Sequence, residues 1–241
     1  MEMEPRCVHC GFGIKTLFVQ YSPGNIRLMK CENCKEVADE YIECEIMIPL
    51  IDLILLKRKA YRHFLFNMLN QEIYTEGILW KTSFLFLMLD ACGTLVLNRS
   101  QGDRCLSSSS FSSAWVCGKM LVHVFLGNLV FFYVLVVATR VLLRSSSKET
   151  RYKDLLLAIL VSSYFKIFLL AMMVWEFPSS VIFIIDGFVL SSNAISLKVM
   201  TEATTIRCLG ACFSAHVMKF LACQMLEVIS STSLRYFRIN C

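Results

Sequence analysis

Long apolar runs constrain this sequence more than any other feature. Four of them are long enough to cross a bilayer: Ile78–Leu97, Met120–Thr139, Leu155–Trp175 and Ser179–Leu197. About 20 mostly apolar residues, wound as an α-helix, cover the ~30 Å hydrocarbon core of a membrane. Charged residues make up 18% of the chain and hydrophobic residues 56%, whereas about a quarter of a soluble domain is charged. The sequence therefore predicts an all-α polytopic membrane bundle.

A fifth run, Cys208–Ile229, is more polar than the others. His216, Lys219, Cys223 and Glu227 follow one another at helical spacing, so they share one face of a helix. We favour a fifth spanning helix whose polar face turns toward the bundle. The alternative is an amphipathic helix that lies at the membrane interface.

Basic residues flank the apolar runs, and they predict an orientation. The net charge is +5, but no basic stripe with interleaved aromatic residues is present, so we expect no nucleic-acid partner. If the chain threads back and forth, most basic residues near span ends fall on one side: Lys57, Arg58, Lys59, Arg62, Arg140, Arg144, Lys148, Arg151, Lys153 and Arg207. The positive-inside rule makes that side cytosolic, which predicts a cytosolic N-terminal segment.

The N-terminal segment contains two C-x2-C pairs, Cys7/Cys10 and Cys31/Cys34. Strand-forming residues and a Ser-Pro-Gly-Asn turn lie between the pairs, so the pattern predicts a knuckle, a hairpin and a second knuckle. Four thiolates suit one tetrahedral zinc ion in a closed, structural site. Two disulfides are the alternative, which a reducing cytosol disfavours. His9 and Cys44 are less favoured as ligands.

These features divide the chain into three parts. We expect a zinc ribbon over 1–45, a connecting helix over 46–77 and the membrane region over 78–241. The apolar stretch Ile46–Leu56 is too short to span. It is either a helix buried under the ribbon or an interfacial helix whose basic end meets anionic lipid. The basic residues expected at the membrane surface are Lys57, Arg58, Lys59 and Arg62.

A charged residue inside a span costs free energy unless it is paired with an opposite charge or in contact with water. Asp90, Lys166 and Asp186 lie within spans, and Lys198 lies at a span end. One hypothesis is a polar cavity that takes a lipid head group. The other is a pair of Asp–Lys ion pairs, or lysines that snorkel to the surface. These residues and His123 form no recognised catalytic arrangement.

The loop between the first two predicted spans contains Cys105 and Cys117. The predicted orientation places this loop in an oxidising lumen, where the two residues could form a disulfide. Two free thiols are the alternative.

The first quarter of the chain resembles the Arv homology domain. The resemblance rests on the four cysteines and on the segments YSPGNIRL, ADEYIE, IDLIL and AYRHFLFN. The hydrophobic region that follows resembles the same family by its hydropathy, and the chain looks like a plant-type Arv protein. This resemblance implies a protein of sterol homeostasis in the endoplasmic reticulum membrane, with roles in sterol uptake, lipid transport and sterol distribution between membranes. It also implies links to sphingolipid metabolism and to glycosylphosphatidylinositol precursors.

Three hypotheses of function follow. The favoured one is a non-enzymatic mediator of sterol homeostasis, whose partners are membrane lipids and other membrane proteins of the endoplasmic reticulum. The second is a scaffold whose cytosolic ribbon recruits lipid-metabolic proteins. The third is a membrane enzyme that modifies lipid, for which the sequence offers no catalytic pattern.

Overall fold

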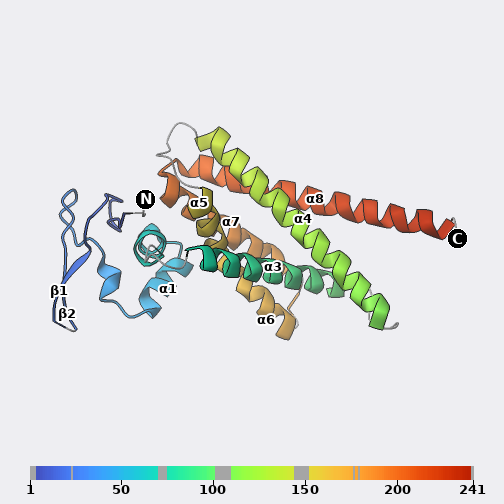
Figure 1. The fold of residues 1–241 in the computed structure, drawn as a ribbon, viewed down its shortest axis with the longest axis horizontal. Coiled ribbons are helices and arrows are strands. Elements are labelled where there is room, and N and C mark those ends of the chain that lie inside the picture. The colour runs from blue at the N-terminus through green and yellow to red at the C-terminus, as the bar shows by residue number, and fades with distance from the viewer. Residues whose placement is uncertain are drawn as a thin grey trace. The chain divides into compact units, whose positions relative to one another are not determined.

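The chain divides into two compact units, Met1–Trp80 and Lys81–Cys241, in a computed structural model (Figure 1). The structure describes residues 4–22, 24–69, 75–100, 110–143, 152–175, 177–178 and 180–239.

The N-terminal unit is built on a two-stranded antiparallel hairpin. Strands β1 (Phe18–Ser22) and β2 (Asn25–Leu28) pair with Phe18 opposite Leu28, and a register shift falls between Gln20 and Ser22. Single bridges outside the hairpin join Arg6 to Gly13 and Lys30 to Val37. Each bridge closes one C-x2-C knuckle, so both knuckles form as predicted.

Short helices follow the second knuckle: the 3₁₀ turn η1 (Glu40–Ile42), α1 (Met47–Ile54), α2 (Arg58–Arg62) and the π-helical turn η2 (His63–Met68). Val8, Tyr41 and Ala60 are buried together, and Leu53 of α1 packs against them. Tyr61, Leu65 and Phe66 of α2 and η2 are also buried. A unit of about 80 residues buries a smaller share of its surface than a larger domain does, which makes the polar contacts and the cysteine cluster important for this unit.

The second unit is helical. Its elements are α3 (Thr75–Ser100, whose first turns belong to the N-terminal unit), α4 (Ser110–Leu143), α5 (Tyr152–Ser162), the 3₁₀ segment η3 (Ser163–Ile167), α6 (Phe168–Val174), α7 (Val181–Thr201) and α8 (Thr205–Ile239). Within the described residues, five segments are long and apolar enough to cross a membrane: Gly77–Leu97, Cys117–Leu142, Tyr152–Val174, Val181–Thr201 and Thr205–Ile229. The predicted fold class is confirmed, and the chain is a multi-pass membrane protein.

The third span differs from the uniform helix that its hydropathy predicts. It is α-helical through Ser162, winds as a 3₁₀ segment over Ser163–Ile167, and resumes as α6. Such a segment inside a helix marks a local constraint. Ser163 donates its hydroxyl to the Ile159 carbonyl, and the segment includes Lys166, whose ammonium group pairs with a residue of α3.

The helices also begin and end beyond the predicted runs. Helix α4 begins at Ser110, inside the loop predicted between the first two spans, and α8 continues to Ile239. Cys117 is an exposed free thiol on α4. Cys105 lies outside the described residues, so the bridge between the two stays a prediction.

Small side chains allow the helices of the second unit to pack closely. Residues of α4, α5, α7 and α8 form one buried cluster, to which α8 contributes Cys208, Ala211, Cys212 and Ala215, each at most 1% exposed. Between α4 and α8, a Cβ atom on Gly127 would lie 2.8 Å from the Cys223 sulfur, so any larger residue there would force the Cys223 side chain to move. Close approach through small residues is typical of helices that associate in lipid.

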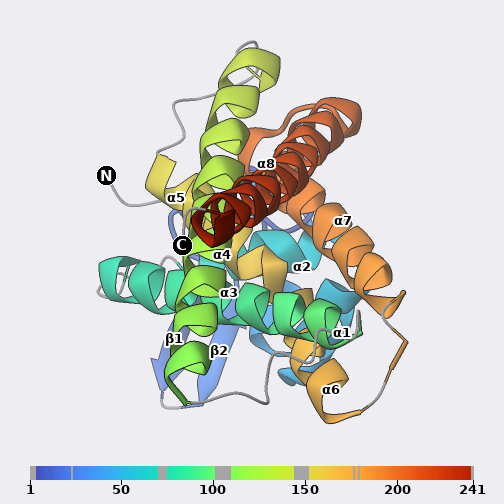
Figure 2. The same cartoon turned by 90° about the vertical axis from the view of Figure 1, so that its right-hand side faces the viewer.

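Helix α3 crosses α4 rather than running alongside it (Figures 1 and 2). The two helices touch through aromatic rings: the Phe86 ring lies 6.4 Å from that of Phe131 and 5.6 Å from that of Phe132, centroid to centroid. On α3, Gly93 leaves room for a methyl group of Leu169 from α6.

Candidate metal centre and buried charge clusters

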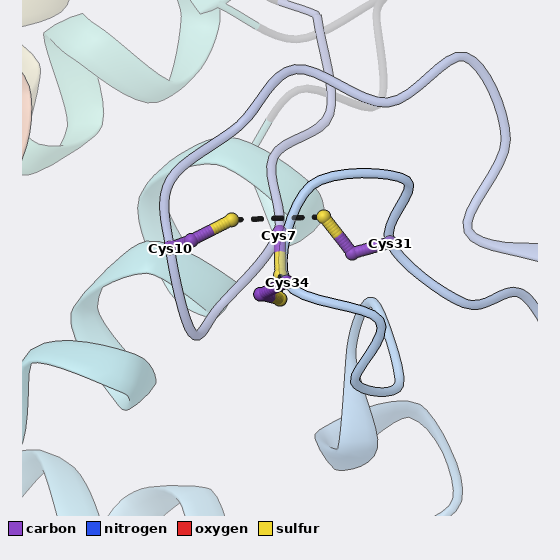
Figure 3. Close-up of side chains that lie close together, drawn as sticks. All are labelled: Cys7, Cys10, Cys31 and Cys34. Carbon is purple, nitrogen blue, oxygen red and sulfur yellow. Dashed lines mark hydrogen bonds between the residues drawn. The ribbon is translucent and has the colours of Figure 1, made fainter.

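The four knuckle cysteines converge on one point (Figure 3). Their sulfur atoms all lie within 4.8 Å of one another. The sulfurs of Cys7 and Cys34 are 3.7 Å apart, and those of Cys10 and Cys31 are 3.6 Å apart. A tetrahedral zinc ion with bonds of about 2.3 Å would hold its sulfurs about 3.8 Å apart. These distances are far longer than a disulfide bond of about 2.05 Å, so the donor set fits a four-thiolate zinc site.

The two knuckles repeat the same backbone pattern. In the first, Cys7 N donates to Phe12 O and Gly11 N donates to Cys7 O, each at 2.9 Å. In the second, Cys31 N donates to Glu36 O at 2.8 Å and Lys35 N donates to Cys31 O at 3.0 Å. Both turns need a positive φ after the second cysteine: +81° at Gly11 and +65° at Lys35. This repetition presents all four thiols to one centre.

The surroundings of the thiols are unequal. Burial raises the pKa of Cys7 to about 12, against the effect of hydrogen bonds from nearby backbone groups. Burial also opposes ionisation of Cys10, but hydrogen bonds from the Phe12 backbone and the Asn33 side chain bring its pKa down to about 7. His9 and Cys44 are not in the cluster: His9 lies 3.7 Å from a carboxylate oxygen of Glu40, and the Cys44 thiol donates to the Glu40 carbonyl.

A fully buried carboxylate, Asp39, joins the ribbon to the helical turns that follow it. One oxygen accepts the backbone N–H of Tyr41, and the other lies 2.6 Å from both His63 Nδ1 and Asn67 Nδ2. Asn67 also exchanges two hydrogen bonds with the backbone of Arg6. Sequence reasoning missed this cluster, although its members fall in the ADEYIE and AYRHFLFN segments.

The four basic residues predicted at the membrane surface divide into two kinds. Lys57 pairs with Asp52 and Lys59 pairs with Glu40, and Arg58 is exposed. Arg62 instead points toward the first knuckle, where its Nη1 donates to the carbonyls of Val8 and His9. These two contacts show that the half-buried Arg62 supports the first knuckle, and its predicted place at the membrane surface stays a prediction.

Asp52 also links α1 to the ribbon, because it accepts a 2.8 Å hydrogen bond from the Tyr41 hydroxyl. Hydrogen bonds from Lys57 and then Tyr41 hold the pKa of Asp52 below its usual value. Burial is the main cause that raises the pKa of Tyr41. This hydrogen bond and the charge of Asp52 raise it further.

A second carboxylate, Asp90 of α3, lies in the helical unit, and its side chain is 10% exposed. One of its oxygens pairs with the ammonium group of Lys166 and the other with that of Lys219. The Lys166 nitrogen also lies 3.8 Å from the centre of the Phe86 ring. Three separate helical segments therefore meet at one ion-paired group, which carries a net charge of +1.

This cluster differs from the two Asp–Lys pairs considered from sequence. Asp186 is exposed on α7 and makes no ion pair within the described ranges, and Lys198 donates to the hydroxyl of Thr205. Lys219 was not expected to pair with Asp90, although its place on the polar face of the fifth run was a signal. Most of that face turns inward, since His216 lies 4.9 Å from the Phe131 ring and Cys223 lies against Gly127, whereas Glu227 is exposed.

A network of hydroxyls and one amide joins α5 and η3 to α7. The Asn193 side-chain oxygen accepts hydrogen bonds from Ser162 and Ser163, and Ser192 donates to the Ser162 carbonyl. Ser196 donates to the Ala158 carbonyl. These serines therefore form hydrogen bonds between helices, as polar side chains inside lipid commonly do.

Comparisons with known proteins agree with this architecture. The model of the Arv1-like family matches residues 6–197. Protein ARV 1 of Arabidopsis thaliana is 52% identical over 225 residues, covering 93% of this chain and 89% of the relative. Protein ARV 2 of the same organism is 52% identical over 220 residues, covering 91% and 93%. Protein ARV1 of Homo sapiens is 28% identical over 201 residues, covering 80% and 71%. No solved structure matches the chain.

Proposed function

Because the chain belongs to the Arv1-like family, we propose that it acts in sterol homeostasis as a multi-pass protein of the endoplasmic reticulum membrane. The observation that carries the proposal is the extent of the family match, residues 6–197. This range includes all four clustered cysteines and reaches into the fourth candidate span. A match limited to the ribbon would support only a metal-binding module.

The proposed role is sterol uptake and the distribution of sterol between membranes, without chemical turnover of the lipid. Effects on sphingolipids and on glycosylphosphatidylinositol precursors follow in this proposal from the changed sterol content of the membrane. The helical unit supplies the lipid-facing surface. Asp90, Lys166 and Lys219 serve to hold its helices together, since each of their charged groups already has a partner.

In the same proposal, Cys7, Cys10, Cys31 and Cys34 hold one structural zinc ion, which would stabilise the two knuckles by joining them. The ribbon lies in the cytosol. Protease added to sealed microsomes should then remove an epitope placed at the N-terminus, whereas protection of the epitope would reverse this orientation.

The test of the sterol role uses cells that lack their own Arv-type protein. Expression of the chain should restore the normal division of sterol between endoplasmic reticulum and plasma membrane, measured after fractionation. The Cys7→Ser variant should restore it poorly, and Cys44→Ser, which changes a cysteine outside the cluster, should restore it fully. No restoration by the unmodified chain would contradict the proposal.

Purified protein distinguishes the alternatives. Binding of a fluorescent sterol to the chain in detergent would support a direct role. Restoration in cells without any sterol binding would favour the scaffold. Conversion of a labelled lipid by the purified chain would favour the enzyme.

A further inference from the structure

Helix α1 is unusual because its side chains are mostly apolar and yet exposed. Seven large apolar residues at and around the helix are exposed, with exposed fractions from 43% to 76%: Ile46, Met47, Ile48, Leu50, Ile51, Ile54 and Leu55. Only Pro49 within the helix is buried. Single exposed apolar side chains are ordinary, but a contiguous group of this kind marks an interaction surface.

The exposed residues form one continuous surface. At about 100° per residue, they cover slightly more than half of the helix circumference, and no charged residue interrupts them. The opposite side attaches α1 to its own unit. There Leu53 packs against Val8, Tyr41 and Ala60, and Asp52 accepts a hydrogen bond from the hydroxyl of Tyr41.

The features of this helix fit the surface of a lipid bilayer. Eight residues make a helix of about 12 Å, too short to span but suited to lie in the interface. The chain already enters a membrane nearby in sequence: from Leu69 to the first candidate span at Gly77 it extends at most about 28 Å. A large apolar surface at such a position is typical of interfacial helices.

Basic residues at the end of the helix also favour contact with a bilayer surface. Basic residues follow α1 directly, and they differ in how far they are neutralised. Lys57 pairs with Asp52 and Lys59 pairs with Glu40, whereas Arg58 is exposed and makes no ion pair in the described part of the chain. A free guanidinium beside an apolar surface is placed to meet lipid phosphate.

We propose that the exposed face of α1 lies in the interfacial layer of a phospholipid bilayer, with Arg58 at the level of the phosphates. The N-terminal unit is then attached to the membrane by a surface as well as by its linker. This inference depends on membrane insertion of the spans and not on the proposed sterol role.

The test places a photoreactive benzoylphenylalanine in the full chain, reconstituted into vesicles of phosphatidylcholine and phosphatidylserine. At Ile51, on the exposed face of α1, irradiation should give a peptide that carries the mass of a phospholipid. At Gln20, on the exposed hairpin, the same probe should give no lipid adduct. Adding Leu50→Asn and Ile54→Asn should lower the yield at Ile51.

Other outcomes overturn the proposal. Crosslinks from Ile51 to peptides of this chain would show that α1 is covered by protein, either the spans or a second copy. Equal lipid adducts at Ile51 and Gln20 would show that contact is unspecific. Arg58→Glu should lower the yield in vesicles that contain phosphatidylserine and leave it unchanged in phosphatidylcholine alone, and an unchanged yield in both would remove Arg58 from the proposal.

Discussion

Asp39 of the N-terminal unit is fully buried and Asp90 of the helical unit is largely buried, but the groups around them differ. Asp39 is surrounded by hydrogen-bond donors from the backbone of Tyr41 and the side chains of His63 and Asn67. Asp90 is held by the ammonium groups of Lys166 and Lys219. The first arrangement orders a small unit, and the second joins helices that are already stable by themselves.

The difference follows from the solvent of each unit. A unit in water gains from burying apolar surface, but one of this small size buries a limited share of it, so we expect metal and hydrogen bonds to supply much of the remaining stability. Helices in lipid gain little by burying apolar surface against each other. They associate through close packing of small residues and through polar links, as Gly127 and the Asp90 cluster illustrate.

The largest expected effect is the loss of the fold in one unit while the other stays folded. Removing zinc, or Cys7→Ser, should unfold the N-terminal unit and leave the helical unit intact, because zinc binding to such sites contributes about 10 kcal/mol or more. Elemental analysis should give about one zinc per chain, and amide hydrogen exchange should rise only in the N-terminal unit. Cys44→Ser should keep its zinc. An N-terminal unit that stays protected after complete removal of zinc would contradict the four-thiolate assignment.

The next effect lies in the helical unit. Asp90→Leu should lower its free energy of unfolding by about 3–5 kcal/mol, because the buried ammonium group of Lys166 and the partly buried one of Lys219 lose the carboxylate with which they pair. Adding Lys166→Met and Lys219→Met should recover most of the loss, since an apolar replacement for a buried ion pair is often neutral. Thermal unfolding in detergent measures both. A triple variant that is less stable than Asp90→Leu would show that the cluster has another role.

A smaller loss is expected at the other carboxylate. Asp39→Asn should destabilise the N-terminal unit by about 2 kcal/mol, because the new amide has one acceptor oxygen and cannot serve both the Tyr41 N–H on one side and the His63 and Asn67 side chains on the other. Hydrogen bonds to a charged group contribute about 1.5–3 kcal/mol. Amide exchange of residues 38–41 in the full chain measures the change. Glu43→Gln, an exposed neighbour, is the control. Equal exchange in the two variants would exclude Asp39 as the link.

The smallest effect compares the knuckles. Lys35→Gly should stabilise the second knuckle by up to about 1 kcal/mol, because a left-handed conformation costs about 1–2 kcal/mol for residues with a Cβ and glycine gives back part of this in the unfolded chain. Gly11→Ala should destabilise the first knuckle by a similar amount. Resistance of bound zinc to a chelator measures both. Weaker retention of zinc by Lys35→Gly, or stronger retention by Gly11→Ala, would contradict the conformational argument.

Local spacing in the sequence was enough for the features that depend on neighbours along the chain. The C-x2-C pairs predicted the knuckles, and the apolar runs predicted the spans, because both are set by a few residues or by one helix. The positive φ at Lys35 could also have been expected, since Gly11 holds the same place in the first knuckle. The Arv resemblance, carried by the first quarter of the chain, extends through residue 197.

Tertiary structure decided which polar groups meet. Lys219 lies 129 residues from Asp90 in sequence, and spacing along the chain could not select it over Lys198 as a partner. Arg62 stands in a basic run, and spacing along the chain could not predict that its guanidinium donates to the carbonyls of Val8 and His9. Hydropathy cannot distinguish a 3₁₀ segment from an α-helix, so the break at Ser163–Ile167 was hidden. These outcomes depend on where distant segments pack, because a buried charge takes its partner from whichever helix lies beside it.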